Sequence, residues 1–180
     1  MSGRRLEAVL DEAGLAAWAS VAGRAAAAGG VLVALRGPLG AGKTTFVRAA
    51  LRAAGAERDA RSPTYTLHHP HRLRGGGRAH HLDLYRIADA AELDDLGWEE
   101  LADSGEAVFV EWAGRAGKRL PPDRWEVELA MARGGGRRRL VARALGRAPD
   151  LPDLPDATGR PEARPGCRPA ASPAGEDARC

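Results

Sequence analysis

The residues best suited to chemistry in this chain form one short run, Gly-Pro-Leu-Gly-Ala-Gly-Lys-Thr, at 37–44. The run fits G-x-x-x-x-G-K-[ST], the pattern of a loop that binds phosphate groups. Glycines let the backbone approach phosphate oxygens closely, and successive N–H groups can point at them. Lys43 can reach the outer phosphates, and the Thr44 hydroxyl can hold Mg²⁺. The predicted phosphate-binding residues are Gly37, Pro38, Leu39, Gly40, Ala41, Gly42, Lys43, Thr44 and Thr45.

A phosphate loop alone does not hydrolyse a nucleotide, because a carboxylate is also needed near the metal. Glu111 follows the apolar run Ala107–Val110, at the strand end where phosphate-loop proteins place their acid. Asp is usual at that place, so Glu is a longer substitute. The alternative is a glutamate that ends a strand in solvent. We favour Glu111 as a Mg²⁺ ligand.

Two further segments are candidates for the hydrolytic step. Asp83 lies among apolar neighbours, where a carboxylate is costly unless it is paired or near a metal. It either assists catalysis or contacts Mg²⁺ indirectly, or else it forms an ion pair with Arg86 or another arginine. Ser62-Pro63-Thr64 places two hydroxyls around a rigid proline, which suits a segment that closes on the γ-phosphate. An ordinary turn is the alternative for that segment.

Composition excludes several other functions. The chain contains no Asn and no Gln, so it lacks the Asn-Lys-x-Asp motif and the water-orienting Gln of common GTPases. The five histidines have no second ligand set at zinc spacing, so they are interpreted as loop histidines. Both cysteines, Cys167 and Cys180, lie near the C-terminal end, which rules out a disulfide framework. No apolar run approaches the ~20 residues of a membrane span, and a cytoplasmic location is expected.

The basic residues are almost all arginine, with lysine only at positions 43 and 118. The arginines at 72–74 and 137–139 suit either nucleic-acid phosphates or a solvated surface. The net charge of +3 is small for a nucleic-acid-binding module.

The elements around these residues indicate an α/β fold, a three-layer sandwich like that of P-loop NTPases with a central mixed sheet. Helices are expected from Asp11 or Glu12 to about 28, at 43–54, from 89 and from 97. Strands are expected at 6–10, 31–36, from 65, at 78–85, at 107–110, at 125–129 and at 139–142, with a turn or loop at 68–77. We expect one domain at 1–147 and a disordered tail rich in Pro, Ala and Gly at 148–180.

Several motifs in one order resemble the TsaE family, also called YjeE, over about residues 6–145. They are Gly-Pro-Leu-Gly-Ala-Gly-Lys-Thr-Thr-Phe (37–46), Ser-Pro-Thr-Tyr-Thr-Leu (62–67), His-Leu-Asp-Leu-Tyr-Arg (81–86), Glu-Leu-Asp-Asp-Leu-Gly (92–97) and Val-Glu-Trp (110–112). The chain departs from the family at Ala113, where relatives often have Pro, and at 11–13, where the usual Thr is missing.

The resemblance implies a small ATPase that binds ATP and Mg²⁺ and works with the proteins TsaD and TsaB. Together they form threonylcarbamoyladenosine next to the anticodon of tRNA, and the ATPase resets the complex between turnovers. Neither a membrane nor DNA is an expected partner. By matching motifs, Lys43, Thr64, Asp83 and Glu111 would serve hydrolysis, with Thr44 and Glu111 on Mg²⁺. Trp112 and Arg137 would lie near the nucleotide.

Two other functions use the same residues. A small-molecule kinase on this scaffold would carry a lid, for which the loop at 68–79 is the candidate, and would pass the γ-phosphate to an acceptor. A nucleic-acid-binding module would use the arginine clusters and hold RNA at physiological salt.

Overall fold

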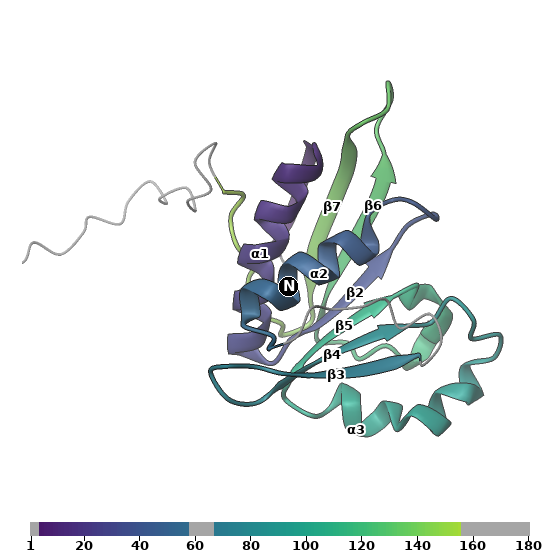
Figure 1. Ribbon diagram of the computed structural model, residues 1–180. Helices are drawn as coiled ribbons and strands as arrows, with labels where there is room; N and C mark the ends of the chain where they lie inside the picture. The colour runs from purple at the N-terminus through teal and green to yellow at the C-terminus, as the bar shows by residue number, and fades with distance from the viewer. Residues whose placement is uncertain (1–3, 58–66, 156–180) are drawn as a thin grey trace, which may run out of the picture.

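The computed structural model describes residues 4–57 and 67–155, which form an α/β domain around one sheet (Figure 1). The strands of this sheet are β1 (Arg5–Leu10), β2 (Leu32–Arg36), β3 (His68–Arg72), β4 (Arg78–Asp83), β5 (Ala107–Glu111), β6 (Arg124–Met131) and β7 (Arg138–Leu145). Among the described residues the order is β1-β7-β6-β2-β5-β4-β3. The four strands from β6 to β4 run parallel, while β3, β7 and β1 pair antiparallel with their neighbours. The predicted mixed sheet is confirmed.

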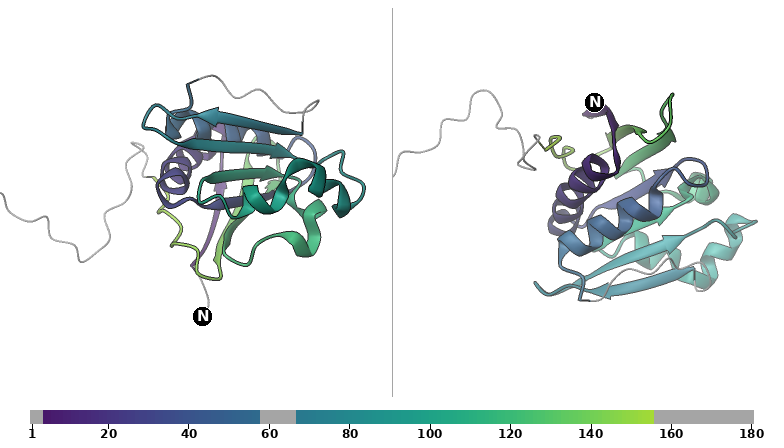
Figure 2. Two further views of the ribbon diagram at one scale, coloured as in Figure 1. Left: turned by 90° about the horizontal axis from the view of Figure 1, so that it is seen from below. Right: turned by 45° about the horizontal axis from the view of Figure 1, so that its top comes forward.

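Within residues 4–57 and 67–155, five helical segments cover the sheet. They are α1 (Glu12–Gly29), α2 (Lys43–Ala54), η1 (Ala90–Leu96), α3 (Trp98–Ala102) and η2 (Ala113–Arg119), of which η1 and η2 are 3₁₀ helices. The long helices α1 and α2 lie on one face, and the three short segments lie on the other (Figures 1 and 2). The result is the three-layer arrangement predicted from the sequence.

The ends of α1 and α2 follow directly from local sequence. The Asp11 carboxylate accepts a hydrogen bond from Gly14 N–H at 2.8 Å, which satisfies one of the unpaired amides of the first turn of α1. Gly30 and Gly55 end the two helices in the left-handed conformation that suits glycine. These signals explain why both helices were predicted close to their observed bounds.

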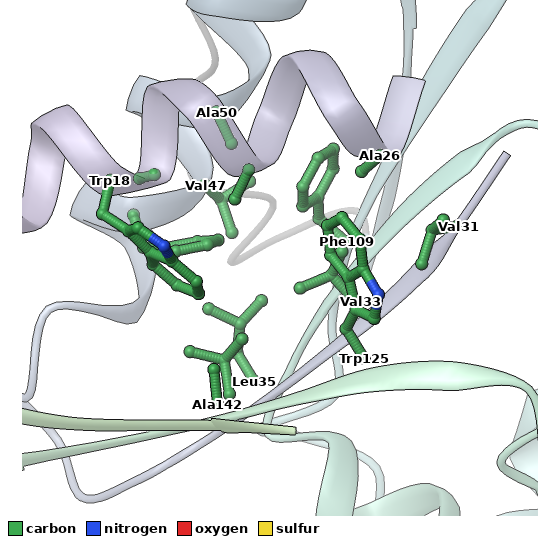
Figure 3. Packing of buried hydrophobic residues seen from close by; sticks show 14 of the residues in the cluster. Trp18, Ala26, Val31, Val33, Leu35, Val47, Ala50, Phe109, Trp125 and Ala142 are labelled. Atoms are coloured by element: carbon green, nitrogen blue, oxygen red, sulfur yellow. The ribbon is translucent and has the colours of Figure 1, made fainter. Parts of the chain in front are cut away.

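The core lies in two layers on either side of the sheet. The larger one joins α1 and α2 to the sheet through large buried side chains such as Trp18, Phe109 and Trp125 (Figure 3). The smaller one packs α3, η1 and η2 against the other face through Leu93 and Trp98, among others. Strands β2 and β5 contribute to both layers, which is why their sequences are apolar at nearly every position.

The prediction of a turn or loop at 68–77 is wrong for its first half. Residues His68–Arg72 form strand β3, and the turn is confined to 73–77. Pro70 has no N–H to donate. It is tolerated because β3 is the edge strand of the described sheet, and alternate N–H groups of an edge strand face away from the sheet. The histidines therefore lie on strands rather than in a loop, and His71, His80 and His81 are buried.

The first part of the segment predicted as a disordered tail packs on the domain. Leu151 is buried, and the carbonyl oxygens of Pro149 and Pro152 accept hydrogen bonds from the indoles of Trp125 and Trp18. Composition favoured disorder here, but two tryptophan N–H groups and an apolar pocket order residues 148–155. Residues 156–180 lie outside the described residues.

Candidate nucleotide-binding site

The predicted phosphate loop joins the end of β2 to the start of α2. Gly37, Gly40 and Gly42 all have positive φ, at 138°, 76° and 103°. At Gly37 a Cβ atom would lie 2.0 Å from the carbonyl oxygen of Leu129, so no other residue fits there without moving β6. Gly42 is the residue that precedes α2 at its N-terminal cap, and no side chain caps the helix there, so its first-turn amides have no side-chain acceptor. An anion is the ligand that such an end binds.

Lys43 is the first residue of α2 and points into this loop. Its ammonium donates to the carbonyl oxygens of Gly37 at 2.8 Å and Pro38 at 2.9 Å. It also lies 3.8 Å from the centre of the Trp112 ring, a cation–π contact. Burial lowers the pKa of Lys43, while the carboxylates of Glu111 and Asp83 act in the opposite direction. The residue is only 4% exposed, so its charge is directed at the loop rather than at solvent.

Thr44 and Glu111 meet at the centre of the site. The Thr44 hydroxyl donates to Glu111 Oε2 at 2.9 Å, although 67 positions separate them in the chain. Glu111 ends β5, next to β2 in the sheet, so the parallel pairing brings its side chain beside the loop. Its other oxygen, Oε1, lies 2.9 Å from Nε2 of His81. Glu111 is 2% exposed, which excludes the alternative of a solvated strand end.

Asp83 lies opposite Glu111 in the pairing of β4 with β5. Its Oδ1 accepts a hydrogen bond from the Tyr85 N–H at 3.0 Å. Burial raises the pKa of the Asp83 carboxyl and the nearby Glu111 charge raises it further, while the Tyr85 N–H lowers it. No ion pair with Arg86 is among the described contacts of Asp83. The structure therefore brings Asp83 to the same edge of the sheet as the loop.

Two aromatic rings border the loop. Trp112 has φ 55° and ψ 34°, a left-handed conformation that costs a residue other than glycine about 1–3 kcal/mol. This backbone turn places the indole over Lys43, and Tyr85 packs on the indole with ring centres 4.9 Å apart. Tyr85 is half exposed, so the pair connects Lys43 with the molecular surface.

The residues present fit a nucleoside triphosphate and Mg²⁺. Thr44 and Glu111 supply two oxygen atoms 2.9 Å apart, and Mg²⁺ prefers oxygen ligands. Lys43 and the start of α2 supply positive potential next to them. The glycines leave the loop without side chains that would fill the space above it; at Gly40 a Cβ atom would meet nothing within 4 Å.

The neighbouring residues Arg137 and Arg138 have different surroundings in the structure. The guanidinium of Arg137 donates to the carbonyl oxygen of Val9 on β1, at 3.0 Å. The next residue, Arg138, lies near the phosphate loop, since a Cβ atom on Gly42 would be 3.9 Å from its Nε. The structure therefore brings Arg138 near the loop, and the role of Arg137 near the nucleotide stays a prediction.

Three more residues of the predicted loop are in the described part of the structure, whereas Thr64, predicted for the hydrolytic step, is not. Ala41 is buried, Leu39 is 81% exposed, and Thr45 lies in the first turn of α2. Thr64, with the rest of the segment 62–64, lies outside the described residues, so its role stays a prediction.

Sequence reasoning missed His81 and Tyr85. Both belong to the run 81–86, in which only Asp83 was assigned a role. The alternation of that run does place His81 and Asp83 on one face of β4, which is the signal that could have found His81.

Among residues 4–57 and 67–155 no group of three or more His, Cys, Asp or Glu side chains is arranged to hold a metal by itself. None of the helices in the same ranges is long and apolar enough to cross a membrane.

The sequence of this chain is similar to those of known TsaE proteins. The family model "Threonylcarbamoyl adenosine biosynthesis protein TsaE" matches residues 10–140. The tRNA threonylcarbamoyladenosine biosynthesis protein TsaE of Treponema pallidum is 33% identical over 71% of this chain and 92% of its own length. That of Haemophilus influenzae is 37% identical over 51% of this chain, and the match spans 57% of the relative.

A solved structure supports the same assignment. The crystal structure of Bacillus subtilis YdiB superposes with a TM-score of 0.65 and 26% sequence identity, and the match covers 81% of this chain and 88% of YdiB. The match therefore extends far beyond the phosphate loop. The chain belongs to the TsaE family of tRNA threonylcarbamoyladenosine biosynthesis proteins.

Proposed function

We propose that this protein is a Mg²⁺-dependent ATPase that supports a TsaD–TsaB complex in forming threonylcarbamoyladenosine in tRNA. The observation that carries the proposal is the contact of Thr44 with Glu111 beside the phosphate loop. This contact gathers a phosphate loop, two oxygen ligands and a buried lysine within one site. Membership of the TsaE family supports the role in threonylcarbamoyladenosine biosynthesis.

The binding step uses charge and backbone rather than covalent chemistry. Lys43 and the first-turn amides of α2 would hold the phosphates, and Thr44 and Glu111 would hold Mg²⁺. Bound Mg²⁺ would neutralise charge on the phosphate oxygens. Lys43 must leave the carbonyl oxygens of Gly37 and Pro38 to reach a phosphate, which exchanges two neutral acceptors for an anionic one.

Hydrolysis also requires a group that orients or deprotonates water. Asp83 has one oxygen bonded to Tyr85 N–H, and Oδ2 has no hydrogen bond among the described contacts. The raised pKa of Asp83 makes its carboxylate a stronger base than an exposed one. We assign Asp83 Oδ2 the role of accepting a hydrogen bond, and in turn a proton, from the attacking water.

Partner proteins are part of the proposal because the site reaches the surface through apolar side chains. Leu39 at the tip of the loop and Tyr85 beside Trp112 are two of the exposed large hydrophobic residues. Such residues at the mouth of a nucleotide site suit contact with a protein that responds to the bound nucleotide. TsaD and TsaB are the proteins we propose to make this contact.

The test is the rate and fate of phosphate released from γ-labelled ATP, with and without purified TsaD and TsaB. The proposal predicts slow release of inorganic phosphate by the protein alone and faster release with the partners. Lys43→Ala should abolish the activity, whereas Lys118→Ala, which changes the other lysine at an exposed position, should keep it. Label found in an acceptor instead would indicate the kinase. Partners that alter neither hydrolysis nor repeated tRNA modification would refute the role.

A further inference from the structure

His81 is a buried histidine that the proposed chemistry does not use. It lies on β4, is 0% exposed, and pairs through its backbone register with Phe109 of β5 and His69 of β3. Its Nε2 lies 2.9 Å from Glu111 Oε1. Among the described contacts its Nδ1 has no hydrogen-bond partner. The contact with Glu111 is therefore the one polar interaction of the ring that the structure describes.

The direction of this hydrogen bond follows from the groups. An ionised carboxylate can only accept, so Nε2 carries the hydrogen and donates it to Glu111. Glu111 is then bound at both oxygens, by His81 at Oε1 and by Thr44 at Oε2. A glutamate side chain has three rotatable bonds, and a hydrogen bond at each carboxylate oxygen restricts rotation about them. The strand that carries His81 is itself paired on both sides, so the donor is held rigidly.

We propose that His81 is a positioning residue that orients Glu111 for Mg²⁺. By occupying Oε1, it leaves Oε2 facing the Thr44 hydroxyl, the second oxygen ligand of the proposed metal site. This inference rests on the proposed function, because it assigns Glu111 to the metal. Hydrogen-bond partners of a metal ligand commonly change metal affinity by ~10–100-fold when they are removed.

The neighbouring residue provides a matched control. His80 is also buried, at 5% exposure, but it precedes His81 on β4, and successive side chains of a strand lie on opposite faces. Its Nε2 lies 2.6 Å from Glu106, and its Nδ1 lies 3.0 Å from His68. Replacing His80 removes a buried, hydrogen-bonded histidine of the same strand without touching Glu111. A merely structural role for His81 would make the two replacements alike.

The experiment measures Mn²⁺ binding by electron paramagnetic resonance in the presence of ADP, which is not hydrolysed. His81→Asn places an amide near the position of Nδ1 and loses the donor to Glu111, whereas His81→Gln carries its amide to the position of Nε2. We expect His81→Asn to weaken Mn²⁺ binding by ~10–100-fold, His81→Gln to recover most of it, and His80→Asn to leave it unchanged. Affinity for ADP without metal should stay the same in all three.

Each contrary result has a distinct meaning. If folded His81→Asn binds Mn²⁺ as the wild type does, or if Gln fails to restore binding, the inference is overturned. If Glu111→Gln binds Mn²⁺ normally, the metal assignment in the proposed function fails instead. Should His81→Asn not fold, the ¹⁵N spectrum of the wild-type imidazole decides. A hydrogen on Nε2 of His81 in the presence of Mg²⁺ and ADP is expected, and a bare Nε2 would overturn the inference.

Discussion

Replacing Gly23 of α1 by alanine should destabilise the protein, although alanine is the better helix former. Gly23 lies where α1 crosses α2, and a Cβ atom there would be 2.2 Å from the carbonyl oxygen of Ala50 and 2.5 Å from its Cα. Both of those atoms are backbone, so no side-chain rotation relieves the overlap. Since α2 begins at the phosphate loop, the prediction also tests what holds that helix in place.

The magnitude can be worked from these distances. Ordinary contact would require the helices to separate by about 1 Å at this point, in a core packed at crystal-like density. Overpacking of this kind costs ~1–3 kcal/mol, and backbone-to-backbone overlap belongs at the upper end. The gain in helix propensity returns up to about 1 kcal/mol. A net loss of about 2 kcal/mol would lower the melting temperature by ~4–8 °C for a chain of this length.

Urea and thermal denaturation followed by circular dichroism provide the assay. The control is Gly29→Ala at the end of the same helix, where the added Cβ would meet Val31 at 3.4 Å and Pro149 at 3.6 Å, both ordinary contacts. That variant should be as stable as the wild type or slightly more so. A Gly23→Ala protein that unfolds at the same urea concentration as Gly29→Ala would refute the packing of α1 on α2 described above.

Three other perturbations have predicted outcomes. Gly37→Ala should weaken both folding and nucleotide binding, because its Cβ would meet the β6 backbone. Gly40→Ala has open space around the added Cβ and should lose only the ~1–2 kcal/mol of folding free energy that a left-handed alanine costs. Equal melting temperatures of the two variants would contradict this prediction. Burial and nearby histidines lower the pKa of His71 from 6.5 to about 4, so the unfolded chain binds the extra proton and stability should fall as pH drops from 6.5 to 4. His71→Leu should flatten that part of the pH profile in urea titrations, and an unchanged slope would assign it to other groups. Leu151→Ala should cost ~2–5 kcal/mol in the same assay, while a loss below about 0.5 kcal/mol would show that the segment 148–155 contributes little.

The central part of the fold could be predicted because each element has local signals. A capping aspartate and a terminal glycine indicate where α1 begins and ends. An apolar run without alternation predicts that β5 is a strand buried on both faces. The phosphate-loop pattern fixed the start of α2 at Lys43 and indicated that Glu111 would lie near Thr44. These inferences need only the chain near each element and the rule that parallel strands end at one edge.

The features that escaped prediction depend on contacts between distant residues. Strand β3 contains three histidines and a proline, a poor strand composition, and it forms because β4 supplies a partner. The 3₁₀ helix η2 was not predicted. It begins after the left-handed turn at Trp112, and that turn occurs together with the contact between the Trp112 ring and the distant Lys43. Packing of residues 148–155 depends likewise on Trp18 and Trp125, which are far away in sequence.

The most direct test of the nucleotide site is calorimetric titration of the protein with ATP, with and without Mg²⁺. One ATP should bind per chain, Mg²⁺ should strengthen the binding, and Glu111→Gln should remove that strengthening while leaving binding of free ATP. Lys43→Ala should weaken binding in both conditions, and Lys118→Ala in neither. Absence of ATP binding by the folded wild-type protein, or binding that ignores both Mg²⁺ and Lys43, would contradict the assignment of the loop and its acid.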